Sequence, residues 1–175
     1  LHFALHTRER SSRNMQQDDI ETIKKTFSNA SLLPEIANIL REGHTVTLLL
    51  RGYSMRPFLE DNRDKALLKK TDYIKVGDAV LAEILPHKFV LHRIVKIDNN
   101  AITLRGDGNL SNENCLKADI LGTAIGFYRK GSNRIDRTDG MKWKIYSFIW
   151  MNLYPIRRYL LAFYRRIWIR LFGIV

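Results

Sequence analysis

A serine and a histidine in two separate apolar segments are the residues of this chain best placed to do chemistry. Ser54 lies in a turn after the apolar run 46–50, and His92 interrupts the strand-like run 89–97. A serine hydroxyl is a weak nucleophile at neutral pH and needs a base within hydrogen-bonding reach. Imidazole is the most frequent such base. The pair therefore suggests nucleophilic catalysis with Ser54 as nucleophile and His92 as general base.

Neighbouring residues favour this interpretation over its plain alternatives, a turn serine and a buried histidine. Gly52 permits unusual backbone angles before the serine, Met55 offers an apolar flank, and Pro57 stiffens the exit of the turn. Alternation along 89–97 places His92 on one face of a strand, among apolar residues that keep imidazole neutral. Arg93 then faces the other way, where a carboxylate could pair with it.

Two acidic residues are candidates to orient the histidine. The segment 106–113 follows a strand-like run and contains Asp107, between two glycines, and Glu113. Either carboxylate could accept a hydrogen bond from His92 and fix its tautomer, as in a Ser-His-Asp triad. The same segment is about equally well explained as a tight turn.

Taken together, these blocks resemble the signal peptidase I and LexA-type serine peptidase superfamily. The resemblance covers about 45–128 and rests on these segments in this order: Gly52-Tyr53-Ser54-Met55-Arg56-Pro57, Leu91-His92-Arg93, Gly106-Asp107-Gly108-Asn109 and Asp119-Ile120-Leu121-Gly122-Thr123-Ala124. It implies a mainly β fold with a coiled-sheet core.

The residue before Arg93 distinguishes branches of that superfamily. Most bacterial signal peptidases and LexA-type repressors have lysine there, whereas the endoplasmic-reticulum, archaeal and sporulation-type branch has histidine, as this chain does. The resemblance implies a serine endopeptidase that cleaves signal or leader peptides, with the Ser54 amide helping to stabilise the oxyanion. It also implies an acid at position 113. Glu113 occupies the place of an aspartate, so Asp107 and Glu113 both stay open.

The elements that position these residues follow from periodicity. We expect short helices over 18–29 and 31–41, the second capped by Ser31, with Pro34 in its first turn and Gly43 after its end. Strands are expected over 46–50, 65–69, 79–85, 89–97, 102–105 and 120–128, separated by turn signals. This pattern divides the chain into a disordered leader (1–17), a helical segment (18–43), a peptidase core (44–130), a linker (131–140) and a helical tail (141–175).

Charge is concentrated in the tail. The chain has a net charge of +11, and residues 140–175 hold seven Lys or Arg and no Asp or Glu. The tail is also rich in aromatic and aliphatic residues and is divided by Pro155, with no uninterrupted apolar run of about 20 residues. These features predict a peripheral anchor on an anionic membrane surface. The alternative is a segment that packs on the body or on a partner.

Other functions have weaker support. A self-cleaving LexA-type regulator would need a scissile Ala-Gly or Cys-Gly bond, and neither dipeptide occurs. A non-catalytic peptide-binding relative would not need all the motif blocks that are present here. No Cys/His cluster suggests a metal, and no cofactor or nucleic acid is expected. We expect an extended peptide or preprotein substrate.

Overall fold

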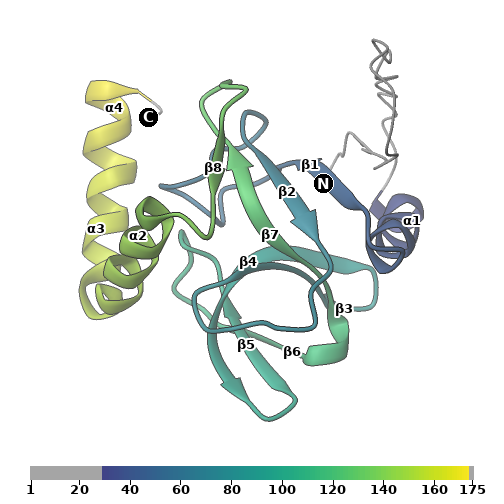
Figure 1. The fold of residues 1–175 in the computed structure, drawn as a ribbon. Helices are drawn as coiled ribbons and strands as arrows, with labels where there is room; N and C mark the ends of the chain where they lie inside the picture. Colours follow the sequence, from purple (N-terminus) through teal and green to yellow (C-terminus); the bar gives the residue numbers. More distant parts are fainter. Residues whose placement is uncertain (1–28, 174–175) are drawn as a thin grey trace.

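The computed structural model describes residues 29–173, which form an open antiparallel sheet of eight strands with helices at both ends of the chain. Helix α1 (Asn29–Arg41) lies on one side of the sheet and the C-terminal helices on the other (Figure 1). The fold is thus mainly β, as expected. The helix predicted over 18–29 falls almost wholly outside the described residues, and Ser31 lies inside α1 instead of at its start.

The strands match the expected runs closely. They are β1 (Thr45–Leu49), β2 (Lys65–Lys69), β3 (Ala79–Leu85), β4 (Lys88–Asp98), β5 (Ala101–Arg105), β6 (Glu113–Leu116), β7 (Ile120–Tyr128) and β8 (Ile135–Arg137). Their order is β1-β2-β7-β3-β4-β5-β6, and β8 pairs with β7. Strands β6 and β8 were not predicted, and β8 lies in the segment expected to be a linker.

The sheet has two apolar cores. The first packs α1, through Ile36 and Leu40, against β1 and β7, and Trp143 from the C-terminal segment completes it. The second lies between β3, β4, β5 and β6, with Val80 and Ile94 at its centre. Strand β4 contributes to both cores because its residues alternate between the two faces.

The C-terminal segment is helical, as expected. It comprises α2 (Met141–Asn152), a short turn η2 (Tyr154–Ile156) that contains Pro155, α3 (Arg157–Phe163), a π-helical turn η3 (Tyr164–Trp168) and α4 (Ile169–Phe172). Trp143, Ser147 and Trp150 form the buried face of α2. The segment is therefore packed on the sheet along one face, which the sequence left open.

Candidate active site

Ser54 lies in the connection between β1 and β2, whose ends are tied together. The Leu50 amide donates to the Asp64 carbonyl at 2.9 Å. Gly52 has a φ of 91°, a conformation that is strained for residues with a Cβ atom. Its amide donates to Asp61 Oδ1 at 2.7 Å. The serine turn, residues 50–64, is thus a closed loop with a fixed entry.

Apolar side chains hold the serine turn on the body. Met55 and Phe58 are buried in the first core, while Tyr53 is exposed and Ser54 is partly exposed. The Arg56–Pro57 peptide bond is cis. The serine therefore lies at the boundary between the core and solvent, which is where a nucleophile can meet a substrate.

A buried aspartate that the sequence did not reveal organises the end of this turn. Asp64 is fully buried. Its carboxylate accepts hydrogen bonds from the amides of Glu60 and Lys130, each at 2.9 Å, and from Arg63 Nε at 2.7 Å. Two of its partners lie within the serine turn and the third follows β7, so Asp64 joins the turn to the end of β7.

His92 projects from β4 on the same face as Ile94, as the alternation predicted. It pairs with Val80 of β3 in the sheet and is only 3% exposed. Its Nδ1 lies 2.5 Å from Oε2 of Glu113, the first residue of β6. The two atoms are in close contact without the alignment of a hydrogen bond, and neither has a hydrogen-bond partner within residues 29–173. Of the two candidate acids, Glu113 is therefore the one in contact with the imidazole.

Burial controls the protonation state of His92. Desolvation lowers the pKa of the imidazole below its ordinary value, and the charge of Glu113 acts in the opposite direction. The lowering prevails, so His92 is neutral at neutral pH. A neutral imidazole whose Nδ1 faces a carboxylate carries its proton on Nδ1 and leaves Nε2 free to accept one.

Gly106 is the point at which the serine turn meets His92. Arg105 pairs with Arg93 across β5 and β4, so Gly106 comes next to His92. A Cβ atom placed on Gly106 would lie 3.0 Å from His92 Nε2 and only 2.4 Å from the Ser54 carbonyl oxygen. The free nitrogen of the imidazole and the backbone of Ser54 thus approach the same small space. Any side chain at position 106 would fill it.

Asp107 takes a different partner. Its carboxylate binds Arg93 in a bidentate pair, with Nε to Oδ1 at 2.9 Å and Nη2 to Oδ2 at 2.7 Å. Each residue of the pair is 1% exposed. The prediction that Arg93 would face away from His92 and meet a carboxylate is confirmed, and that carboxylate is Asp107.

Helix α2 closes over the Arg93–Asp107 pair. Tyr146 donates to Asp107 Oδ2 at 2.9 Å, and Trp150 Nε1 donates to the Asp107 carbonyl at 3.1 Å. Arg93 Nη1 donates to Ser147 Oγ at 2.5 Å and also lies over the ring of Trp143. Burial raises the pKa of Tyr146 well above its ordinary value, so its hydroxyl remains a donor.

Later parts of the C-terminal segment hold the same loop. Arg165 Nη2, in the π-helical turn, donates to the Gly108 carbonyl at 2.8 Å, and the Gly108 amide donates to the Ser54 carbonyl at 2.7 Å. Tyr154 donates to the Leu110 carbonyl at 3.4 Å. The site loop, residues 106–111, is therefore fixed between the serine turn and the C-terminal helices. Sequence spacing gave no signal for these contacts.

A large hollow in the described part of the chain lies away from Ser54 and His92. It has a volume of about 690 Å³ and is lined by α2 and by the segment between β2 and β3, including Lys70, Tyr73 and Phe148. Ser54 and His92 are not among its lining residues. A smaller hollow of about 510 Å³ separates the site loop from α3 and η3.

Other reactive groups do not compete with Ser54. Cys115 is buried in the second core, and burial raises the pKa of its thiol to about 11, so the thiolate is scarce at neutral pH. Within residues 29–173 no group of three or more His, Cys, Asp or Glu side chains is arranged to hold a metal ion.

Compared with models of protein families, with curated proteins and with solved structures, the chain gives no significant match.

Proposed function

We propose that this protein is a serine endopeptidase in which Ser54 is the nucleophile, His92 the general base and Glu113 the residue that orients the base. The observation that carries the proposal is the meeting at Gly106, where His92 Nε2 and the Ser54 carbonyl both approach one small space. The contact of 2.5 Å between His92 Nδ1 and Glu113 adds the third member of the array.

The chemistry follows from these positions. Ser54 Oγ attacks the carbonyl carbon of a peptide bond while its proton passes to His92 Nε2. The resulting oxyanion accepts hydrogen bonds from backbone amides, including that of Ser54. His92 then gives the proton to the leaving amine, the C–N bond breaks, and an acyl group remains on Ser54. Water, deprotonated by His92, hydrolyses this ester and restores the serine.

Glu113 supports the base in two ways. Its carboxylate faces Nδ1 and so favours the tautomer in which Nε2 accepts the serine proton. It also stabilises the imidazolium that forms after proton transfer, in a site where burial disfavours that charge. Asp107 is already occupied by Arg93 and Tyr146. We assign it the role of fixing the site loop.

The likeness to signal peptidases supports the substrate class. An open antiparallel sheet carries the motif blocks in the same chain order, and the fold we propose for residues 44–130 is the coiled sheet of that superfamily. Its members cleave extended segments with small residues before the scissile bond, which bind alongside a strand. We therefore propose leader or signal peptides as substrates.

Cleavage of a leader peptide by the full chain tests this function. The peptide carries alanine before the expected scissile bond, and products are identified by mass spectrometry. Ser54→Ala and His92→Ala should each lower kcat/KM by about 10⁴-fold or more. Ser111→Ala, in the exposed site loop, and His87→Ala, in an exposed turn, are the matched controls and should cleave like the wild type. Cleavage that survives both Ser54→Ala and His92→Ala would rule out the assigned pair.

A further inference from the structure

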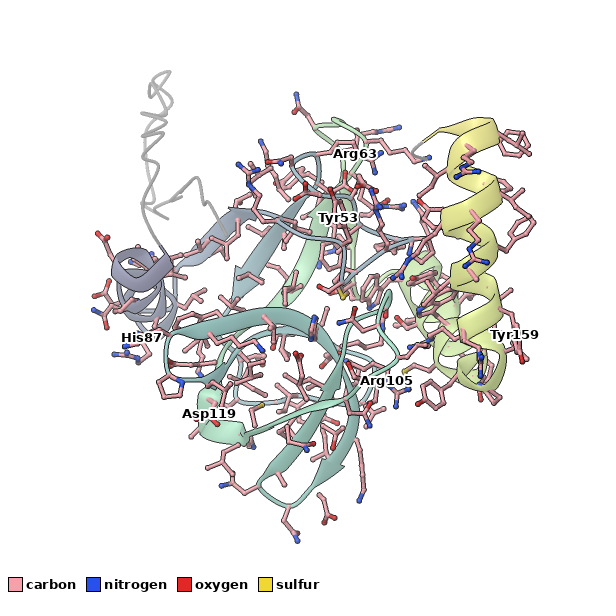
Figure 2. All side chains as sticks on the ribbon, turned by 180° about the vertical axis from the view of Figure 1, so that it is seen from behind. Tyr53, Arg63, His87, Arg105, Asp119 and Tyr159 are labelled. Atoms are coloured by element: carbon pink, nitrogen blue, oxygen red, sulfur yellow. The ribbon has the colours of Figure 1, made fainter. Side chains whose placement is uncertain are left out.

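The helix formed by α3, η3 and α4 carries an exposed apolar row along its whole length. Its members are spaced four residues apart: Tyr159, Phe163, Ile167 and Leu171. Their exposed fractions are 65%, 50%, 44% and 70%. Tyr159 lies on the side of the helix turned away from the sheet (Figure 2). The opposite side, with Arg157 and Leu161, is buried against the body.

The π-helical turn keeps this row straight. In an α-helix, residues four apart drift by about 40° around the axis at each step. A π turn has more residues in each turn, so four residues make less than one full rotation and the drift runs in the opposite direction. The turn spans Tyr164–Trp168, in the middle of the row. The step from Phe163 to Ile167 therefore offsets part of the drift that the α-helical steps add along the row.

A second row, made of arginines, runs beside the apolar one. Arg158, Arg166 and Arg170 are exposed and occupy the positions just before Tyr159, Ile167 and Leu171. The Arg158 guanidinium lies 5.1 Å from the centre of the Tyr159 ring. No Asp or Glu occurs in residues 140–175. The charge of this surface is thus not balanced within the segment. These two rows together are the docking face.

We propose that the docking face binds an anionic membrane, with the α3–α4 helix lying flat in the interface. The apolar row would enter the boundary between headgroups and acyl chains, and the arginines would remain at the phosphates. No helix within residues 29–173 is long and apolar enough to cross a bilayer.

Contacts on the inner side of the helix would give the bound protein a fixed orientation. Arg165 lies next to Arg166 in the chain and binds the Gly108 carbonyl of the site loop. Arg157 is buried and donates to the Trp150 carbonyl. One helix thus joins the docking face to the loop beside Ser54. The proposal concerns lipid binding only and holds whether or not the protein is a peptidase.

Vesicle flotation with the full chain tests the docking face. Wild type should float with phosphatidylcholine vesicles containing phosphatidylglycerol and remain in solution with pure phosphatidylcholine. Each neutralised arginine should weaken binding about fivefold, so Arg166→Gln with Arg170→Gln should lose about 30-fold. The control pair Lys96→Gln with Lys117→Gln removes the same charge from the exposed β4–β6 side and should stay within about twofold of wild type.

A second pair tests the apolar row. Phe163→Ser with Ile167→Ser should lower vesicle binding by about tenfold or more, because both side chains would leave the hydrocarbon boundary. The control pair, Leu85→Ser with Leu116→Ser, changes two exposed leucines outside the docking face and should leave vesicle binding unchanged. Ser54→Ala should bind like wild type. Equal losses of vesicle binding in the arginine variant and the lysine control would overturn the proposal. So would a protein that does not bind vesicles but binds duplex DNA, with the arginine variant binding DNA more weakly.

Discussion

Two consecutive residues of β4, His92 and Arg93, each bind a carboxylate from the segment after β5, and the two pairs differ in how completely they are satisfied. In the Arg93–Asp107 pair both partners are buried, and Tyr146 and Ser147 bind the atoms that remain. In the His92–Glu113 pair the glutamate side chain is 26% exposed, and Nε2 of the histidine faces the space at Gly106.

This difference assigns a structural role to the Arg93–Asp107 pair and a chemical role to the His92–Glu113 pair. A buried ion pair with every group bound has no atom available for a substrate, and breaking it is costly. A pair with one unsatisfied nitrogen beside a partly exposed serine can accept a proton. His92 and Arg93 are consecutive residues of β4, so alternation along the strand places the Arg93–Asp107 pair under α2 and the candidate base on the face of the second core.

Removing one partner of the Arg93–Asp107 pair should have the largest effect on stability. Asp107→Ala leaves the Arg93 charge buried without a partner and should lower the free energy of unfolding by about 3–5 kcal/mol. Glu113→Ala should cost about 1 kcal/mol or less, because the glutamate is partly exposed and His92 is already neutral. Urea unfolding followed by tryptophan fluorescence measures both. Equal losses of unfolding free energy in the two variants would contradict the distinction between the two pairs.

Changing the His92–Glu113 pair should instead affect catalysis. Glu113→Gln keeps the shape of the side chain but can present an amide donor to Nδ1 and cannot stabilise the imidazolium. We expect kcat to fall by about a hundredfold with KM little changed. Glu42→Gln, in an exposed turn, is the control for loss of one negative charge. A KM effect without a kcat effect would assign Glu113 to substrate binding.

The pH dependence should carry the signature of a buried base. Activity requires neutral His92, so kcat/KM should rise with pH, and the midpoint of the rise should lie below the ordinary histidine pKa of about 6.5, because burial lowers the pKa of His92. Glu113→Gln removes a charge that raises this pKa, so the acidic limb should move to still lower pH. Movement to higher pH would contradict the assigned contact.

The same pKa direction predicts a stability change. A histidine that is protonated less readily when folded contributes stability above its unfolded pKa, and this contribution is lost as the pH falls from about 6.5 through the folded pKa. Replacing His92 by Asn should flatten this part of the stability curve. An unchanged pH dependence in His92→Asn would show that His92 contributes none of it.

Loosening the site loop from the C-terminal helix should have the smallest effect. Arg165→Ala removes the donor to the Gly108 carbonyl, and a lost charge-assisted hydrogen bond of about 1.5 kcal/mol should lower kcat by about tenfold. Arg165→Lys should restore part of the lost kcat. Arg166→Ala, at the neighbouring exposed position, is the control and should keep the kcat of the wild type. The shape of the pH profile should not change, because Arg165 acts through the loop and not on the base. A shifted profile would contradict this role.

Local signals made much of this arrangement predictable. Glycine and proline around Ser54 and the alternation along β4 are encoded within a few residues, so the serine turn and the facing of His92 and Arg93 follow from the sequence. Strands β6 and β8 have four and three residues, too few for a periodic pattern to appear. Without β6, the choice between Asp107 and Glu113 had to stay open.

Contacts between distant parts of the chain were the unpredictable part. Tyr146 and Trp150 lie 39 and 43 residues from Asp107, and Arg165 lies 57 residues from Gly108. Nothing in the local pattern of the C-terminal segment indicates that its inner face covers the Arg93–Asp107 pair. Strand β8 lies in the segment expected to be a linker, and the buried side of α2 packs on the sheet, which was the alternative that the sequence left open.

The central claim, that Ser54 is the nucleophile and His92 its base, is tested most directly by trapping the acyl group. The full chain is mixed with a short peptide ester that ends in alanine, quenched in acid within its first turnover, digested and analysed by mass spectrometry. We predict an acyl group on the fragment that contains Ser54, and none in Ser54→Ala or His92→Ala. Hydrolysis of the ester with no acyl group on Ser54, or with one on another residue, would contradict the account.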